Sequence, residues 1–218
     1  MLNKSKGNMY PFVTHTWNTI KGKCPHDCAY CYMKRFGEQP PLHFDEKELK
    51  TDLGEGNFIF VGSSCDMFAS DILLGWIVKT LIHCREFENK YLFQTKNPGQ
   101  IMDYMLPPSS IVGTTIETNR KYPQMGKTDS PQNRVRYMNR ISYEYKTMVT
   151  IEPIMDFDLV SLVDFVEDCH PEWVNIGADS QGHNLPEPPA KKIEQLIIEL
   201  EKFTKVKIKP NLKRLLTT

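Results

Sequence analysis

The chain has neither a long hydrophobic run nor an excess of one charge. Its 218 residues include 27 Lys and Arg and 27 Asp and Glu, so the formal net charge is zero. No apolar run approaches the roughly 18 residues that a membrane-spanning helix needs, which argues against a membrane protein. A neutral chain is also not, as a whole, an electrostatic binder of nucleic acid. Only a local basic surface would suit such a ligand.

The N-terminal sequence MLNKSKGNMY lacks the apolar core of a signal peptide. The chain has six cysteines, at positions 24, 28, 31, 65, 84 and 169. A cytoplasmic location would keep these thiols reduced, and a chain of this size does not need disulfides for stability. With 40% hydrophobic and 25% charged residues it can form one domain with a sizeable core. We therefore expect a single cytoplasmic domain over residues 1–218, of unspecified oligomeric state.

Three cysteines lie close together in the run CPHDCAYCY, at the spacing Cys24-x3-Cys28-x2-Cys31. Three thiolates on one short loop can hold a 4Fe-4S cluster by three of its irons, whereas the four-cysteine ferredoxin spacings ligate all four. The fourth iron is then open to an exogenous ligand, as is the free position of a catalytic zinc site. A Cys3His zinc site completed by His26 or a distant histidine is the alternative. The chain has no second Cys-x2-Cys pair of the kind that ordinary structural zinc prefers.

Short apolar runs rich in β-branched and aromatic residues alternate with amphipathic stretches. They predict strands at residues 12–20, 58–61, 91–95, 111–116, 147–151, 173–176 and 206–208. Apolar stripes predict helices over residues 72–84 and 190–202. An N-cap residue ahead of proline predicts two further helix starts, at Asn97 and Ser130. This alternation of strands and helices favours parallel pairing.

Polar residues follow six of the predicted strands. The segments are GSSCD (62–66), QTKN (94–97), TTIETN (114–119), IEP (151–153), IGADS (176–180) and KPN (209–211). Barrels of α/β type carry their catalytic residues at these strand ends. We therefore expect an α/β fold, a partial (open) TIM-type barrel of about six to seven parallel strands. Lys96, Glu117, Glu152 and Lys209 would form an ion-pair network there or supply an acid or base.

The cysteine motif resembles the signature of the radical S-adenosylmethionine (radical SAM) enzymes, and so does a partial barrel with that motif after its first strand. The resemblance implies a 4Fe-4S cluster on Cys24, Cys28 and Cys31. It also implies S-adenosylmethionine (AdoMet) bound through its amino and carboxylate groups to the open iron, with Tyr30 against the adenine. One electron from the cluster then cleaves AdoMet to a 5'-deoxyadenosyl radical. An electron donor of flavodoxin or ferredoxin type is the implied partner.

Further cofactor contacts follow from the same resemblance, by position along the chain. GSSCD stands where many members have a Gly-Gly-Glu-type segment, which implies that Ser63, Ser64 and Asp66 bind the AdoMet amino group, although the segment departs from that pattern. The other implied contacts are Gln94, Thr115 and Glu117 to the ribose or carboxylate, and Ile176, Gly177 and Ala178 to the adenine.

A narrower resemblance covers nearly the whole chain. The segments TWN-x3-G-x-C, FVGSSCDMF, FQTKNP, VGTTIET, TIEPIMDFD and WVNIGADS occur in the order found in a phage-associated, radical-SAM-like family of unknown function. Members usually have a longer interval before the second cysteine and serine in place of Cys65. The family supports the fold and cofactor and names no substrate. Lys96 and Glu152 match its Thr-Lys and Glu-Pro positions and are our candidate catalytic residues.

Cys65 is a third catalytic candidate, because a thiol beside a radical site can donate a hydrogen atom to a product radical. Some DNA-lesion lyases of the superfamily use a cysteine in this way. The alternative is a small buried side chain, since free cysteine is among the most buried residue types. Cys84 and Cys169 lie in apolar helical runs, and we interpret both as packing residues.

Charge gives the only indication of the substrate. Residues 117–140 contain two acids, Glu117 and Asp129, and six cations, which are Arg120, Lys121, Lys127, Arg134, Arg136 and Arg140. Arginine binds phosphate with two parallel hydrogen bonds, which favours a nucleotide or modified nucleic acid; a solvated helix face is an equal alternative. The proline-rich loop at 179–189 would be a lid or a stiff connector.

We therefore expect a radical SAM enzyme that abstracts hydrogen from a nucleotide or modified nucleic acid. One alternative is radical chemistry on a small metabolite or amino acid, including isomerisation. The other is a non-catalytic iron-sulfur module that transfers electrons or binds a partner.

Overall fold

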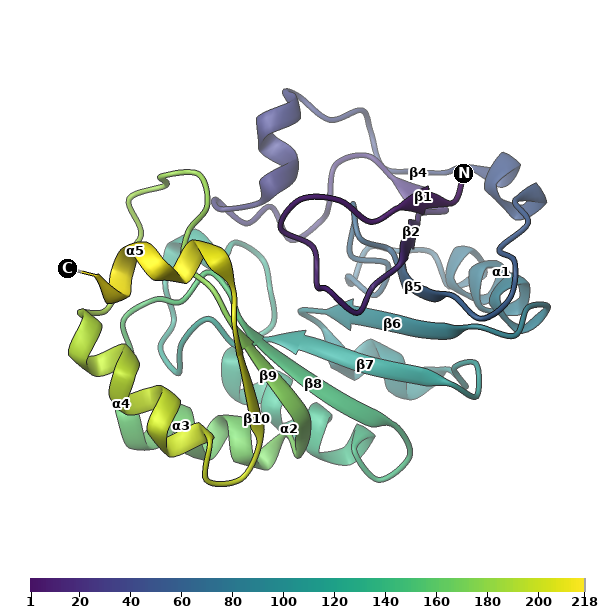
Figure 1. Ribbon diagram of the computed structural model, residues 1–218. Helices are drawn as coiled ribbons and strands as arrows, with labels where there is room; N and C mark the ends of the chain where they lie inside the picture. The colour runs from purple at the N-terminus through teal and green to yellow at the C-terminus, as the bar shows by residue number, and fades with distance from the viewer. Residues whose placement is uncertain (218) are drawn as a thin grey trace.

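Seven parallel strands lie side by side in one sheet of the computed structural model, which describes residues 1–217 (Figure 1). In chain order they are β2 (His15–Trp17), β5 (Phe58–Val61), β6 (Lys90–Thr95), β7 (Ser110–Thr115), β8 (Lys146–Ile151), β9 (Pro171–Ile176) and β10 (Lys205–Ile208). The short β1 (Asn3–Lys4) pairs antiparallel with β2 at one edge. The strands follow one another across the sheet in chain order, so the predicted partial barrel is confirmed.

The first predicted strand is the one that the structure changes. Residues 15–17 form β2, whereas β3 (Ile20–Lys21) pairs with β4 (His43–Phe44) in a separate two-stranded sheet. Phe12 and Val13 lie outside the strand and pack with Tyr10 on the inner face of the large sheet. The apolar run at residues 12–20 therefore predicted burial correctly, but it predicted a strand that is too long.

Four helices cover the outer face of the sheet: α1 (Leu74–Arg85), α2 (Pro131–Ile141), α3 (Leu159–Asp168) and α4 (Ala190–Leu200) (Figure 1). The short α5 (Lys213–Leu216) follows β10. The 3-10 helices are η1 (Tyr32–Phe36), η2 (Glu46–Lys50), η3 (Pro98–Asp103), η4 (Pro123–Met125) and η5 (Pro210–Leu212). No helix in residues 1–217 combines the length and apolarity needed to cross a membrane.

Both predicted helix starts are found, with different geometry. The Ser130 hydroxyl accepts a hydrogen bond from the Asn133 N–H at 3.2 Å and so caps α2. The residues after Asn97 form the 3-10 helix η3, and the Asn97 side chain instead donates to the Phe68 carbonyl at 2.9 Å.

The main core lies between the sheet and these helices. Its strand residues include Val61, Phe93 and Ile176, none more than 1% exposed. Cys84 and Cys169 are fully buried in the same cluster, which confirms that both are packing residues.

A second apolar cluster fills the inner face of the curved sheet near the strand starts. The N-terminal segment before β2 crosses this face, and the Phe12 ring lies 4.9 Å from Trp173 and 5.1 Å from Phe58. Leu92 and Met148, which point inward from β6 and β8, are fully buried beneath it. Filling this end leaves the carboxyl ends of the strands as the accessible end of the barrel.

Candidate functional site

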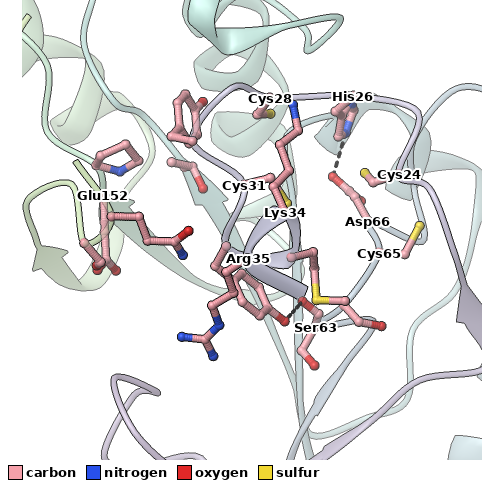
Figure 2. Close-up of a pocket in the computed structure, with 18 of the residues that line it drawn as sticks. Cys24, His26, Cys28, Cys31, Lys34, Arg35, Ser63, Cys65, Asp66 and Glu152 are labelled. Carbon is pink, nitrogen blue, oxygen red and sulfur yellow. Dashed lines mark hydrogen bonds and ion pairs between the residues drawn. The ribbon is translucent and has the colours of Figure 1, made fainter. Parts of the chain in front are cut away.

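A cleft of about 610 Å³ lies at the carboxyl ends of the strands. Its walls come from segments that are distant in sequence: the N-terminal segment, the cysteine loop with η1, the ends of β5, β6 and β8, and the loop after β9. Figure 2 shows the labelled side chains around this space. The clustering of strand ends that the sequence indicated therefore produces a real cavity.

Cys24, Cys28 and Cys31 all line the cleft as free thiols. The loop that carries them is tightly turned: the Asp27 N–H donates to the Cys24 carbonyl at 3.2 Å, and the Cys31 N–H to that of Cys28, also at 3.2 Å. The Cys65 thiol bonds to Cys24 and lowers the pKa of Cys24 to about 6, whereas burial raises the pKa of Cys28 to about 11. Thiolates are the ligands of iron-sulfur clusters, and a donor set of three on one loop beside a cleft fits a 4Fe-4S group.

Other ligand types are not gathered at this point. No three His, Cys, Asp or Glu side chains in residues 1–217 converge as a single metal ion requires. The nearest histidine, His26, is bound to the Asp66 carboxylate at 2.8 Å. Its ring therefore joins the loop to the barrel instead of turning toward the three thiols.

Asp66 holds the cysteine loop against the ends of β5 and β6. Besides His26, its carboxylate accepts the Lys96 N–H at 2.8 Å, the Thr95 hydroxyl at 2.9 Å and the Phe68 N–H at 3.0 Å. Burial would raise the pKa of Asp66, but the bonds from His26 and the backbone outweigh it and keep the pKa below its usual range. The residue proposed for the AdoMet amino group thus lines the cleft with both oxygens already engaged.

Ser63 and Ser64, the other residues of that segment, are positioned by Asn18. The Asn18 side-chain oxygen accepts the Ser64 N–H at 2.9 Å and the Ser63 hydroxyl at 3.3 Å. Tyr32 donates to the Ser63 carbonyl at 2.9 Å and so ties η1 to the end of β5 (Figure 2). Tyr32 lines the cleft and was missed from the sequence, although an aromatic residue directly after Cys31 was a usable signal.

Glu117 is buried beneath the cleft and is not among the residues that line it. Its carboxylate accepts hydrogen bonds from the Tyr30 hydroxyl and, at 2.7 Å, from Arg134. Burial would raise the pKa of Glu117, but Arg134 and Lys96 outweigh it and hold the pKa below its usual range. Tyr30 lines the cleft, and its hydroxyl donates to the Glu117 carboxylate beneath the cleft. Glu117 therefore anchors the cysteine loop from the interior of the protein.

Arg134 is the clearest misinterpretation of the sequence. It was counted among six cations available to a phosphate, yet it is fully buried. Besides Glu117, its guanidinium donates to the Thr115 carbonyl at 2.7 Å and the Thr128 hydroxyl at 2.6 Å. Arg120 is also engaged, in ion pairs with Asp156 and Asp158. The structure therefore removes two cations from the expected basic surface.

The polar residues Lys96, Glu117, Glu152 and Lys209 form two separate pairs. Lys96 lies 3.6 Å from Glu117, and Lys209 lies 2.7 Å from Glu152. Glu152 also accepts from Asn8 at 3.1 Å and Asn211 at 2.9 Å, so it fastens the N-terminal segment and the start of η5 to the end of β8.

The remaining predicted cofactor residues divide between the cleft and the core. Gln94, Thr115 and Ala178 line the cleft, and the Gln94 amide bonds to the Thr115 hydroxyl at 3.3 Å. Ile176 is fully buried in the main core, and a side chain at Gly177 would approach the Glu152 carboxylate to 2.8 Å. Position 177 therefore has no room for a side chain, because Glu152 occupies the adjacent space.

The loop at 179–189 is braced from within. Asp179 accepts the Gln181 N–H at 3.1 Å and the His183 ring at 2.7 Å, and Arg214 bonds to the Glu187 carboxylate at 2.8 Å. His183, which the sequence did not single out, lines the cleft. These bonds favour a stiff wall over a loose lid.

We expect the buried Glu117–Arg134 pair to be a large contributor to stability. Glu117→Gln leaves a buried guanidinium without its carboxylate, and urea unfolding should show a loss of about 3–5 kcal/mol. Because its pKa is lowered on folding, Glu117 stabilises the fold above its unfolded pKa, and this is lost as pH falls through the folded pKa. The variant should lose less stability on acidification than the native chain.

Glu172→Gln is the matched control, since Glu172 forms an exposed pair with Lys146 at 3.6 Å. It should change the free energy of unfolding by about 0.5 kcal/mol or less. Similar losses in both variants would show that burial of the Glu117 pair is unimportant.

Gly126 should be required for the cysteine loop to keep its shape. It adopts φ 67° and ψ −141°, and an added Cβ would overlap the His26 carbonyl oxygen. Gly126→Ala should therefore lower the melting temperature and the iron bound per chain after reconstitution.

Gly37→Ala is the control that distinguishes the effect of the steric overlap at Gly126 from the effect of backbone strain alone. Gly37 has similar backbone angles, φ 82° and ψ −165°, but its Cβ would meet nothing within 4 Å. Strain of about 1–3 kcal/mol is expected in both variants, with iron content lowered only in Gly126→Ala. Equal iron content in the two variants would refute a role for Gly126 in shaping the loop.

Comparison with known proteins supports the fold. No family model and no curated protein matches the chain. Among solved structures, a spore photoproduct lyase variant with bound AdoMet and dinucleoside spore photoproduct is similar over 92% of this chain and 78% of its own, with TM-score 0.67 and 13% identity. A second variant of that lyase gives TM-score 0.66 and 13% identity, over 93% and 78% of the two chains. A structure of the lyase complexed with dinucleoside spore photoproduct gives TM-score 0.61 and 12% identity, again over 93% and 78%. This chain therefore has the fold of spore photoproduct lyase.

Proposed function

We propose that this protein is a radical SAM enzyme that acts on a modified nucleic acid. One observation carries the proposal: the three thiols of the Cys24-x3-Cys28-x2-Cys31 motif line one cleft at the carboxyl ends of a partial barrel. The fold is shared with spore photoproduct lyase, one structure of which holds AdoMet. The narrower assignment to the phage-associated family remains a prediction from the sequence.

Cys24, Cys28 and Cys31 would hold the 4Fe-4S cluster. When bound, the cluster and AdoMet supply a 5'-deoxyadenosyl radical by one-electron reductive cleavage, with the electron from a flavodoxin or ferredoxin type of donor. We place this chemistry in a reducing cytoplasm, where the thiols stay available.

The chain's own groups would orient the cofactor in the cleft. Tyr30, held from below by Glu117, presents its ring beside the adenine, and Ala178 offers a small apolar surface across the cleft. Ser63 and Ser64 are fixed by Asn18 through the Ser63 hydroxyl and the Ser64 N–H, and this segment would face the amino acid part of AdoMet. Gln94 and Thr115 are the ribose contacts.

Three proposed residues act by holding other groups in place. Asp66 and Glu117 already use their oxygens to fix the cysteine loop, so their contribution to AdoMet binding is through that loop. Ile176 supports the adenine side from the core, behind Gly177. Lys96 lies 5.6 Å from the centre of the Tyr30 ring and would place a positive charge beside the cofactor.

The substrate class is supported by the structural neighbours, three of which hold dinucleoside spore photoproduct. Hydrogen abstraction from such a substrate needs the reacting carbon held beside the cofactor with water excluded. The braced loop at 179–189 and the N-terminal segment held by Glu152 would form the walls that do this. Lys96 and Glu152 both line the cleft and are the charged groups that we propose act on the substrate.

Anaerobic reconstitution with AdoMet and dithionite tests the proposal. The native protein should form 5'-deoxyadenosine, measured by chromatography, and a triple Cys24→Ala, Cys28→Ala, Cys31→Ala variant should form none. Turnover of a lesion-bearing dinucleotide or oligonucleotide would establish the substrate class, and turnover of only small metabolites would replace it. A native cluster that neither binds nor cleaves AdoMet would refute the enzyme and favour an electron-transfer module.

Cys65 is our proposed hydrogen-atom donor to the product radical. It lines the cleft beside Cys24 and is 2% exposed, so its thiol is held next to the proposed cluster ligands and shielded from solvent. In the step, the Cys65 S–H bond would break homolytically and a product C–H bond would form. The Cys65 sulfur radical would then take a hydrogen atom from 5'-deoxyadenosine, which becomes the 5'-deoxyadenosyl radical again.

Cys65→Ala and Cys65→Ser should keep 5'-deoxyadenosine formation and change the products from substrate, because neither side chain has a weak S–H bond. Cys84→Ala, which removes a thiol in the core, should leave the products unchanged. A product distribution in the Cys65 variants that equals that of the native enzyme would rule out the donor role.

A further inference from the structure

The short helix η1 forms one rim of the cleft and presents two aromatic rings to solvent. Phe36 is 61% exposed and Tyr32 is 40% exposed, and none of the five residues of η1 is buried. The Arg35 guanidinium lies 4.6 Å from the centre of the Phe36 ring and 5.7 Å from that of Tyr32. In Figure 2, Arg35 extends into the open space between Glu152 and Ser63.

Contacts from Tyr32 and Lys34 hold η1 in place at the cleft. The Tyr32 hydroxyl is bonded to the Ser63 carbonyl, and the Lys34 ammonium is paired with Asp27 at 3.0 Å. Single exposed apolar residues are common on protein surfaces and carry no meaning alone. Here the exposed Phe36 ring does not itself line the cleft, but it stacks with the guanidinium of Arg35, which does.

Half of the lysine and arginine side chains that line the cleft are neutralised by a carboxylate. Lys34, Lys96 and Lys209 each have a carboxylate within 4 Å. Within residues 1–217, the cleft cations without an ion pair are Lys6, Lys23 and Arg35, and the one cleft acid without one is Glu38. The unneutralised charge at the mouth is therefore positive, although the whole chain is neutral.

We propose that η1 binds a single-stranded nucleic acid that continues from the substrate nucleotide, with Arg35 on a phosphate and a base stacked on Phe36. The proposal rests on the function proposed above for the cleft. Arginine forms two parallel bonds with phosphate, and aromatic rings bind unpaired bases through their faces. A duplex would not serve, because its bases are already stacked on each other and enzymes that act on a base must first remove it from the stack.

Fluorescence anisotropy with a labelled single-stranded DNA 12-mer, and the same sequence as RNA, tests the proposal on the reconstituted full chain. Phe36→Ala and Phe36→Leu should each weaken binding about tenfold, because only an aromatic face stacks on a base. Arg35→Ala should weaken binding and lower the slope of log affinity against log salt by about 0.7, the value for one phosphate of a single strand. Arg35→Lys should keep that slope.

Phe203→Ala is the matched control, since Phe203 is 37% exposed and lies before β10, at the opposite end of the strands. It should bind the strand like the native chain. Equal melting temperatures and cluster absorbance would exclude misfolding in every variant.

The outcomes separate this proposal from the function of the cleft. Loss of strand binding in the η1 variants supports the proposal even if the native chain fails to cleave AdoMet, a result that would refute only the proposed function. Native-like strand binding by Phe36→Ala and Arg35→Ala, or no binding by the native chain, overturns it. So does slower reduction by flavodoxin in Arg35→Ala with strand binding unchanged, since η1 would then be a surface for the electron donor.

Discussion

The buried carboxylate of Glu117 is the constraint on which the rest of the site depends. It comes from the end of β7 and receives Arg134 from α2 and Tyr30 from the cysteine loop. A carboxylate and a guanidinium without solvent contact are tolerated only when their hydrogen bonds are made, and here the remaining donors of Arg134 reach the Thr115 carbonyl and the Thr128 hydroxyl. One charge pair thus fixes a helix, a strand end and the loop that carries the three thiols.

Asp66 repeats this arrangement on the other side of the loop. It draws the cysteine loop, through His26, onto the ends of β5 and β6. A loop held at Tyr30 and at His26 has little freedom between them, so Cys28 is fixed before any ligand arrives, and Cys24 and Cys31 each lie within two residues of a fixed point. Preorganisation of this kind reduces the entropy lost on binding. Asp66 and Glu117 therefore shape the cleft by holding the cysteine loop in place.

The strands were predictable because parallel strands buried on both faces read as continuous apolar runs. The grouping of Cys24, Cys28 and Cys31 at one cleft was predictable because their spacing is a local property of the chain. The pairing of Glu117 with Arg134 could not be predicted from the sequence. Helix α2 carries several cations, and only the packing of α2 against the sheet determines that Arg134 is the buried one. Arg136 and Arg140 on the same helix are exposed. For the same reason Phe12 looked like strand: an apolar residue signals burial, and the surface that buries it is known only from the fold.

The neutral net charge of the chain limits how it could bind the proposed anionic strand. Long-range steering requires an excess of positive charge, which this chain lacks as a whole. Three of the six lysine and arginine side chains that line the cleft are also used internally, as Lys96 and Lys209 are in their pairs with Glu117 and Glu152. Affinity for the proposed strand would then come from a few short-range contacts at the cleft mouth. The guanidinium of Arg35, stacked on the Phe36 ring, would supply that kind of contact at the edge of the cleft.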